Sequence, residues 1–234
     1  MSEFNSDDLG GGWTKRSVLD KNTGKFHNRY FFKRRKAHRI IINTPKSKSL
    51  AGYTLIEKDL RSAIIWLKEI ITMLENNVKF TDGTGNLRFD KNREINNLVK
   101  GLFVAALTFY GKCFSQCEGR RVKIDKKNID LEFHDEHDMA ILLRHNFAAH
   151  SGAEKVERAK VILALDSKRS KNTAPYIVKE LSQPDAPLKS DIEKMIKLFE
   201  HVQLFALNKI EVLTSKVYTD DILPKGADYW YGKT

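Results

Sequence analysis

The segment LVKGLFVAALTFYG, residues 98–111, restricts the fold most strongly, because a helix with this sequence is apolar on nearly every side. Such a helix needs neighbours around it, as the central helix of a bundle does. We therefore predict a helix over residues 92–116 inside a helical bundle. The chain has 234 residues, of which 41% are hydrophobic, and this is enough for one sizeable core.

Three other segments have helical character. Residues 54–74 and 190–217 repeat apolar residues at helical spacing, and Thr54 opens the first of them with a capping-box pattern. A shorter helix is expected over residues 134–150. The recurring apolar positions are Ile56, Leu60, Ala63, Leu67, Ile71 and Leu74 in the first segment, and Ile192, Ile196, Phe199, Ala206, Ile210, Leu213 and Val217 in the last.

Residues 159–165 and 175–181 are rich in β-branched residues and are separated by a polar connection, which predicts a β-hairpin. The expected fold class is mainly α: a four-helix bundle with this hairpin inserted before the last helix and a basic arm at the N-terminus. The expected divisions are a disordered tail over residues 1–12, the basic arm over 13–50, a helical domain over 51–220 and a C-terminal tail over 221–234.

The basic arm carries nearly all of the net charge. Between Trp13 and Leu50 there are twelve Lys or Arg residues and one acid, so this segment alone matches the net charge of +11 of the whole chain. Its β-branched and aromatic content favours one or two strands. The arm is interpreted either as a solvated charge run or as a surface for single-stranded nucleic acid, where phosphates pair with cations and bases stack on aromatic rings. The residues proposed for nucleic-acid contact are Lys33, Arg34, Arg35, Lys36, Arg39, Tyr30 and Phe31.

Several classes of protein are not expected. No apolar segment is long enough for a transmembrane helix, and the first residues lack an apolar signal core, so a cytoplasmic protein with no membrane partner is predicted. The only cysteines, Cys113 and Cys117, are spaced to share one helix face, which favours packing. Two unpaired thiols fit a reducing compartment, and a zinc site would need further ligands.

The stretch LLRHNFAAHSG, residues 142–152, places Arg144, His145 and His150 in an otherwise apolar run. One interpretation is structural: Arg144 reaches solvent and His150 interacts with the helix C-terminus, where the dipole favours a cation. The other is functional, because polar and basic groups on an apolar helix cost desolvation energy unless they face a cleft or an interface. His137, seven residues before Arg144, would lie on the same helix face.

This stretch resembles the Arg-polar-x(3–5)-His signature of the HEPN superfamily, whose members are small helical bundles and often RNases. The segment GLFVAALTFYGKCFSQCEGRR, from Gly101 to Arg121, is similar to the long central helix of a branch near abortive-infection proteins. His137 matches a histidine that often precedes the arginine in that branch. The resemblance covers about residues 54–218.

The resemblance implies a HEPN-type endoribonuclease in defence or stress response that cleaves RNA by 2′-OH attack, without a metal or any other cofactor. Arg144, His145 and His150 would be catalytic, and Asn146 and His137 would position the substrate. A homodimer is expected, with an activating or antitoxin protein as a further partner left open. The alternative function is a catalytically inactive HEPN-like module that binds RNA or protein.

A metal site is the alternative for residues 134–138, HDEHD, because His134 and Asp138 could ligate from successive turns of a helix. The favoured interpretation is a charged first helical turn, where acids stabilise the helix dipole. No complementary cluster of ligands occurs elsewhere in the sequence, so no metal is predicted.

Overall fold

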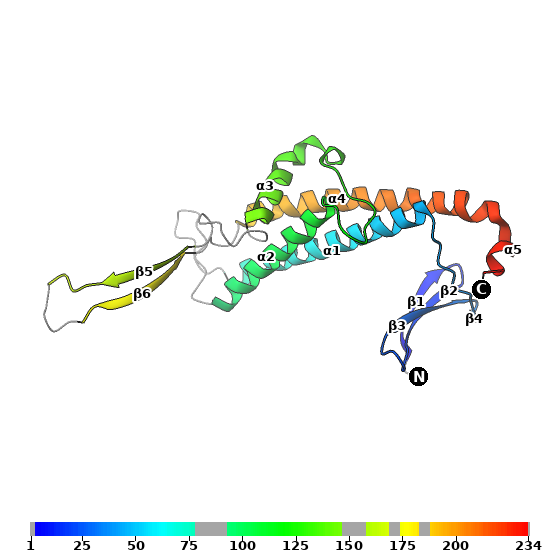
Figure 1. Cartoon of the computed structure of the whole chain (residues 1–234), viewed down its shortest axis with the longest axis horizontal. Coiled ribbons are helices and arrows are strands. Elements are labelled where there is room, and N and C mark those ends of the chain that lie inside the picture. Colours follow the sequence, from blue (N-terminus) through cyan, green and yellow to red (C-terminus); the bar gives the residue numbers. More distant parts are fainter. Residues whose placement is uncertain (1–2, 78–92, 147–157, 169–173, 183–187, 234) are drawn as a thin grey trace. The chain divides into compact units, whose positions relative to one another are not determined.

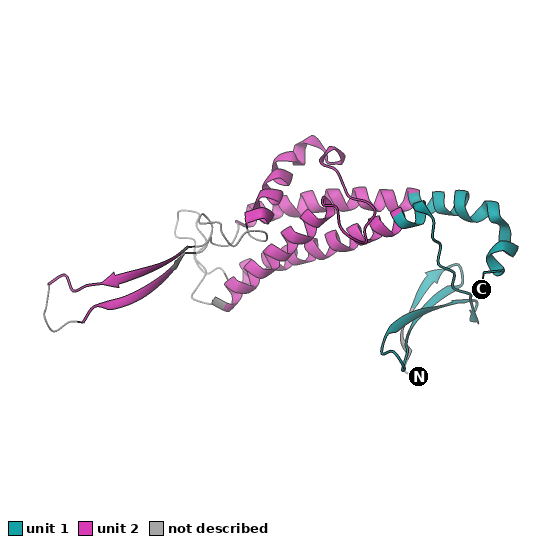
Figure 2. Cartoon of the chain, viewed as in Figure 1, with its two compact units in different colours: residues 1–48, 213–234 teal, residues 49–212 magenta. Residues whose placement is uncertain are grey.

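The structure is a computed structural model that describes residues 3–77, 93–146, 158–168, 174–182 and 188–233. Most of these residues are helical and the rest include two small antiparallel sheets, so the mainly α fold class is confirmed. The chain forms two compact units (Figure 2). One consists of residues 1–48 with 213–234, and the other of residues 49–212.

Four helices account for most of the larger unit (Figure 1). Their bounds are Pro45–Asn77 for α1, Arg93–Cys113 for α2, His134–Arg144 for α3 and Lys189–Lys216 for α4. α1 and α4 run antiparallel, because ion pairs join Lys68 to Glu200 at 2.7 Å and Glu75 to Lys189 at 2.5 Å. None of the helices in the described ranges is both long and apolar enough to cross a membrane.

α2 is the central helix, as its sequence predicts. From Leu102 to Cys113 none of its residues is exposed. Phe109 packs against Trp66 of α1 with ring centroids 4.8 Å apart, and the Tyr110 ring stacks on Phe199 of α4 at 4.1 Å. Phe199 has no exposed surface, and the full burial of a large apolar side chain of this kind stabilises the fold by about 1.5–3 kcal/mol.

The expected start of the first helix at Thr54 is wrong, because α1 already begins at Pro45. Thr44 caps it: its Oγ1 accepts the Ser47 backbone N–H at 3.1 Å, and Ser47 Oγ accepts the Thr44 backbone N–H at 2.9 Å. Proline is favoured at the first helical position. Serine stands here in place of the usual Glu or Gln of a capping box, so the pattern was missed. Thr54 lies within the helix and donates to the Leu50 carbonyl.

The predicted hairpin before α4 is confirmed. Strands β5 and β6 span Arg158–Ala164 and Tyr176–Ser182. They pair antiparallel in unbroken register, from Arg158 opposite Ser182 to Ala164 opposite Tyr176.

The smaller unit contains a four-stranded antiparallel sheet in the order β1-β2-β3-β4. The strands span Glu3–Gly10, Trp13–Leu19, Phe26–Phe32 and Arg35–Lys36. The basic arm therefore contains more strand than expected. Each strand follows its neighbour in sequence, so short turns connect the whole sheet.

The tail over residues 1–12 was expected to be disordered, whereas most of it forms β1. Gly10 pairs with Trp13, which leaves Gly11 and Gly12 as a two-residue turn with φ of 59° and 84°. A type I′ turn requires positive φ at both positions, and glycine adopts it without steric cost. The three glycines at the end of this expected tail therefore build a hairpin turn.

The C-terminal residues 221–234 were expected to form a tail, and they too have regular structure. α4 is followed by a π-helical segment Val217–Ile222, a 3-10 turn Leu223–Lys225 and a short helix α5, Gly226–Tyr231. The Trp230 indole N–H donates to the Ile222 carbonyl at 3.1 Å, which folds α5 back onto this segment.

Candidate functional site

Arg144 is the last residue of α3 and is half-buried. Among the residues that the structure describes, its guanidinium has no hydrogen-bond or ion-pair partner. An arginine whose only task was to stabilise the fold would be expected to pair with a carboxylate or a carbonyl when half-buried. Arg144 is therefore a candidate for binding an anion.

Gly111 of α2 makes room for the Arg144 side chain. A Cβ at position 111 would lie 2.2 Å from Arg144 Cδ and 2.8 Å from its Nε, distances that are sterically forbidden. The arginine stem thus runs directly across the α2 backbone. A side chain of any size at position 111 would displace it.

The residues that follow Arg144 in the RHNFAAH stretch begin where the α-helical geometry of α3 ends. The chain becomes π-helical at His145 and Asn146, and irregularities of this kind are frequent at functional sites. His145 is exposed and Asn146 is half-buried. His150, the predicted general base, lies outside the described residues, and so does the expected helix end near Gly152.

His137 does not lie on an exposed face with Arg144. Only 5% of it is exposed, its Nδ1 is 2.7 Å from the Tyr110 hydroxyl, and its ring packs against Phe114 at 4.6 Å. Burial lowers the pKa of His137. The charges of Lys126 and His134 lower this pKa further, whereas the charge of Asp138 raises it. The structure places this residue, expected to position substrate, in the core of the bundle.

Replacing His137 by glutamine is expected to make the stability of the protein less dependent on pH. The pKa of His137 in the folded protein is below its usual 6.5, so the unfolded chain binds a proton that the folded protein resists. The neutral His137 therefore contributes its full share to the free energy of unfolding above pH 6.5. This share is lost as the pH falls toward the folded-state pKa, by at most about 1.4 kcal/mol per pH unit.

Urea unfolding of the wild type and His137→Gln at pH 7.5 and pH 5.5 measures this effect. The difference in unfolding free energy between the two pH values should be larger for the wild type, and equal differences would contradict the prediction. The other six histidines are common to both proteins and cancel in the comparison.

The acidic and histidine-rich start of α3 is held together by contacts within the chain. His134 Nε2 donates to the Ile129 carbonyl at 3.1 Å, and Asp138 forms an ion pair with Lys126 at 2.6 Å. The hydrogen bond from Lys126 lowers the pKa of Asp138. No group of three or more His, Cys, Asp or Glu side chains suited to a metal ion occurs within the described ranges.

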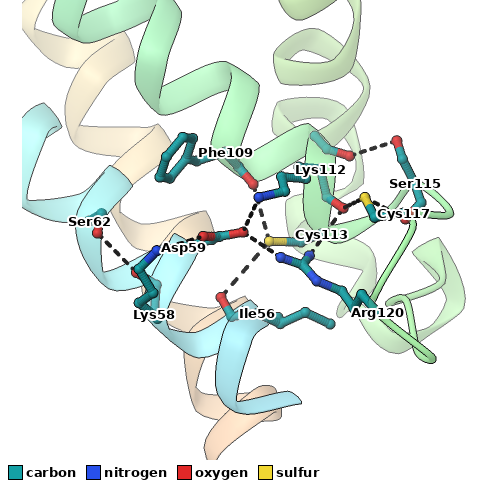
Figure 3. A network of polar contacts seen from close by, with 11 residues as sticks. Ile56, Lys58, Asp59, Ser62, Phe109, Lys112, Cys113, Ser115, Cys117 and Arg120 are labelled. Carbon is teal, nitrogen blue, oxygen red and sulfur yellow. Dashed lines mark hydrogen bonds and ion pairs between the residues drawn. The ribbon is translucent and has the colours of Figure 1, made fainter. Parts of the chain in front are cut away.

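A buried ion pair connects α1 to the loop that follows α2 (Figure 3). Asp59 is 2% exposed and Arg120 is 5% exposed, and the Arg120 guanidinium donates to Asp59 Oδ2. Lys112 Nζ is 3.3 Å from the same oxygen, and Arg120 also donates to the Lys112 carbonyl at 3.3 Å. Arg120 thus fixes the loop to α1 and α2, and Lys112 joins the two helices through Asp59, which indicates a structural role for all three residues.

Cys113 lies beside this network and has no exposed surface. Its thiol is 3.2 Å from the Phe109 carbonyl, and burial raises its pKa to about 12. A thiol that is not ionised at neutral pH is a poor nucleophile and a poor metal ligand. This agrees with the packing role predicted for the cysteine.

The residues proposed for nucleic-acid contact are distributed over the N-terminal sheet. Lys33, Arg34, Arg35 and Lys36 are exposed and form the turn between β3 and β4 together with strand β4 itself. Tyr30 and Phe31 point to opposite faces of β3, and Arg39 follows the sheet. The Arg16 guanidinium lies over the Phe31 ring at 4.8 Å.

Two exposed aromatic residues of this sheet were not among the residues proposed for nucleic-acid contact. Trp13 and Phe32 pair across β2 and β3, with ring centroids 4.9 Å apart, and both are exposed. The signal in the sequence was the two-residue turn at Gly11–Gly12. Once this turn is recognised, Trp13 becomes the first residue of a strand, and this strand begins beside the cationic turn.

The chain was compared with models of protein families, with curated proteins and with solved structures, and no match was found in any of the three.

Proposed function

We propose that the protein is a metal-independent endoribonuclease of the HEPN type, acting in defence or stress response. The observation that supports this proposal most is the half-buried Arg144, which has no polar partner among the described residues and is held against Gly111. Arg144 is the first residue of the RHNFAAH stretch, and the resemblance of this stretch to HEPN nucleases suggests RNA cleavage by 2′-OH attack.

In the proposed reaction, the His150 imidazole removes the proton from a ribose 2′-OH, or supplies a proton to the leaving oxygen. The 2′ oxygen attacks the adjacent phosphorus and the bond to the 5′ oxygen breaks, leaving a 2′,3′-cyclic phosphate and a 5′-OH. Arg144 donates its N–H groups to the phosphate oxygens, where negative charge develops. His145 and Asn146 orient these groups.

RNA is the substrate because the attacking oxygen belongs to the ribose. The homodimer that the resemblance implies would bring a second copy of the motif close to the first. His137 is not part of this proposal, because its buried position next to Tyr110 gives it a role in packing.

The test is incubation of purified protein with single-stranded RNA in the presence of EDTA. We expect cleavage, with products that end in 2′,3′-cyclic phosphate. The matched control substrate carries 2′-O-methyl groups and should remain intact, because its 2′ oxygen has no proton to lose. Inhibition by EDTA, or cleavage of the methylated strand, would contradict the mechanism.

The second candidate is a catalytically inactive module that binds RNA. One observation favours it: the cations and aromatic residues of the N-terminal sheet belong to a unit of their own, separate from the unit that contains Arg144. If the wild-type protein binds RNA and leaves it uncleaved, this result would support the second candidate function.

A further inference from the structure

Two turns lie side by side at one end of the N-terminal sheet. The turn at Gly11–Gly12 connects β1 to β2, and a second two-residue turn at Lys33–Arg34 connects β3 to β4. The Lys33 backbone N–H donates to the Gly12 carbonyl at 2.8 Å, and this bond ties the two turns together. They form one continuous edge of the sheet.

Aromatic and cationic side chains meet at this edge. Trp13 is 43% exposed and Phe32 is 39% exposed, and their rings are tilted by 43° with centroids 4.9 Å apart. Lys33 Nζ lies 5.4 Å from the centre of the Phe32 ring. Large aromatic side chains this exposed on a small sheet, next to cations, are typical of a surface that stacks bases.

The acids nearest to this edge already have partners within the unit. Asp7 forms an ion pair with Lys15 at 2.7 Å, and Asp8 accepts the Gly10 backbone N–H at 2.9 Å. Neither contact involves the cations of the Lys33–Arg34 turn. The positive charge at the edge therefore remains available to an anion.

The backbone of the second turn is strained. Lys33 has φ of 45° and Arg34 has φ of 67°, and they are the only described non-glycine residues with positive φ. Asn-Gly or Gly-Gly is the usual sequence for such a turn. Strain of this kind is concentrated at functional sites, where the side chains are needed for something other than the turn.

We propose that this edge, formed by Trp13, Phe32, Lys33 and Arg34, is a binding site for single-stranded nucleic acid. Bases stack on Trp13 and Phe32 while Lys33 and Arg34 bind the adjacent phosphates. A single strand is the ligand because only unpaired bases can present their faces to the rings, whereas a duplex keeps them stacked inside. The site deepens the proposed function, since it rests on RNA being the partner.

The test measures binding of the full chain to a fluorescently labelled oligo(U) with 2′-O-methyl riboses, by anisotropy. This strand cannot be cleaved by 2′-OH attack, so the result does not depend on whether the protein is a nuclease. We expect Trp13→Leu to weaken binding about 10-fold, which is within the range for loss of one base stack. Phe26→Leu is the matched control, because Phe26 is also aromatic and exposed but pairs with Leu19 at the opposite end of the sheet. It should bind within about twofold of the wild type.

A second variant replaces Lys33 and Arg34 together by Asn-Gly. It should raise the melting temperature, because the strain is relieved, and it should weaken binding. It should also reduce the slope of log affinity against log salt by about 1.4, as two phosphate contacts to a single strand are lost.

The proposal is overturned if Trp13→Leu binds like the wild type, or if a duplex of the same length binds as tightly as the single strand. Failure of the nuclease proposal has a different signature. In that case natural RNA would stay intact with the wild type, while the binding of the methylated strand and its loss in Trp13→Leu would be unchanged.

Discussion

Replacing His150 by alanine is expected to abolish RNA cleavage, lowering the rate by about two to four orders of magnitude, the usual contribution of a general acid or base. An unperturbed imidazole titrates near pH 6.5, so it can both accept and release a proton at neutral pH, and alanine can do neither. RNA binding should remain within about twofold, because the N-terminal sheet is unchanged. Time courses with end-labelled RNA and purified protein measure the effect.

Two controls sharpen this test. His27→Ala removes an exposed histidine of the sheet and should cleave like the wild type. Arg144→Lys keeps the positive charge but loses the planar fork of N–H donors, so cleavage should be impaired while the fold is retained. Cleavage by His150→Ala at the wild-type rate would show that the nuclease activity lies elsewhere or comes from a contaminant.

Replacing Asp59 by alanine is expected to lower the free energy of unfolding by about 3–5 kcal/mol, the usual cost of removing one partner of a buried ion pair. The variant leaves Arg120, only 5% exposed, without its counter-charge in the interior. Lys112 cannot compensate, because it is a cation as well. Urea unfolding followed by circular dichroism at 222 nm measures the loss.

The matched control replaces both members of the ion pair, as Asp59→Leu with Arg120→Met. No buried charge is then left unpaired, and well-packed apolar side chains can replace an ion pair at little or no cost. The double variant should therefore be more stable than Asp59→Ala. If it is equally unstable, the loss comes from packing around position 59 and the ion pair contributes little.

The helical bundle could be predicted from the sequence because a helix leaves a periodic pattern of apolar residues within a few turns of chain. The apolar stretch around Phe103 and Leu107 requires cover on all sides, and the structure buries both residues in the centre of the bundle. The hairpin before α4 was likewise visible in two β-rich segments. Periodicity of this kind depends only on neighbours within a few residues.

Features that depend on long-range contacts could not be predicted. Asp59 and Arg120 are 61 residues apart in sequence and nothing local connects them. The seven-residue spacing from His137 to Arg144 predicted a shared helix face. The Tyr110 hydroxyl, which contacts His137 in the core, belongs to another helix and could not be foreseen from this spacing. The sheet was underestimated for a different reason: Gly11 and Gly12 were assigned to a disordered tail, whereas their positive φ angles form a tight turn.

The contact between Gly111 and Arg144 has a consequence for protein engineering. The position of the arginine is determined in part by a residue on another helix that has no side chain, since a Cβ there would overlap Arg144 Cδ. The RHNFAAH stretch is therefore not a self-contained cassette. On another helical scaffold the arginine would keep this position only beside a glycine on the neighbouring helix. A search for designed hosts should therefore select for that glycine before it selects for the motif.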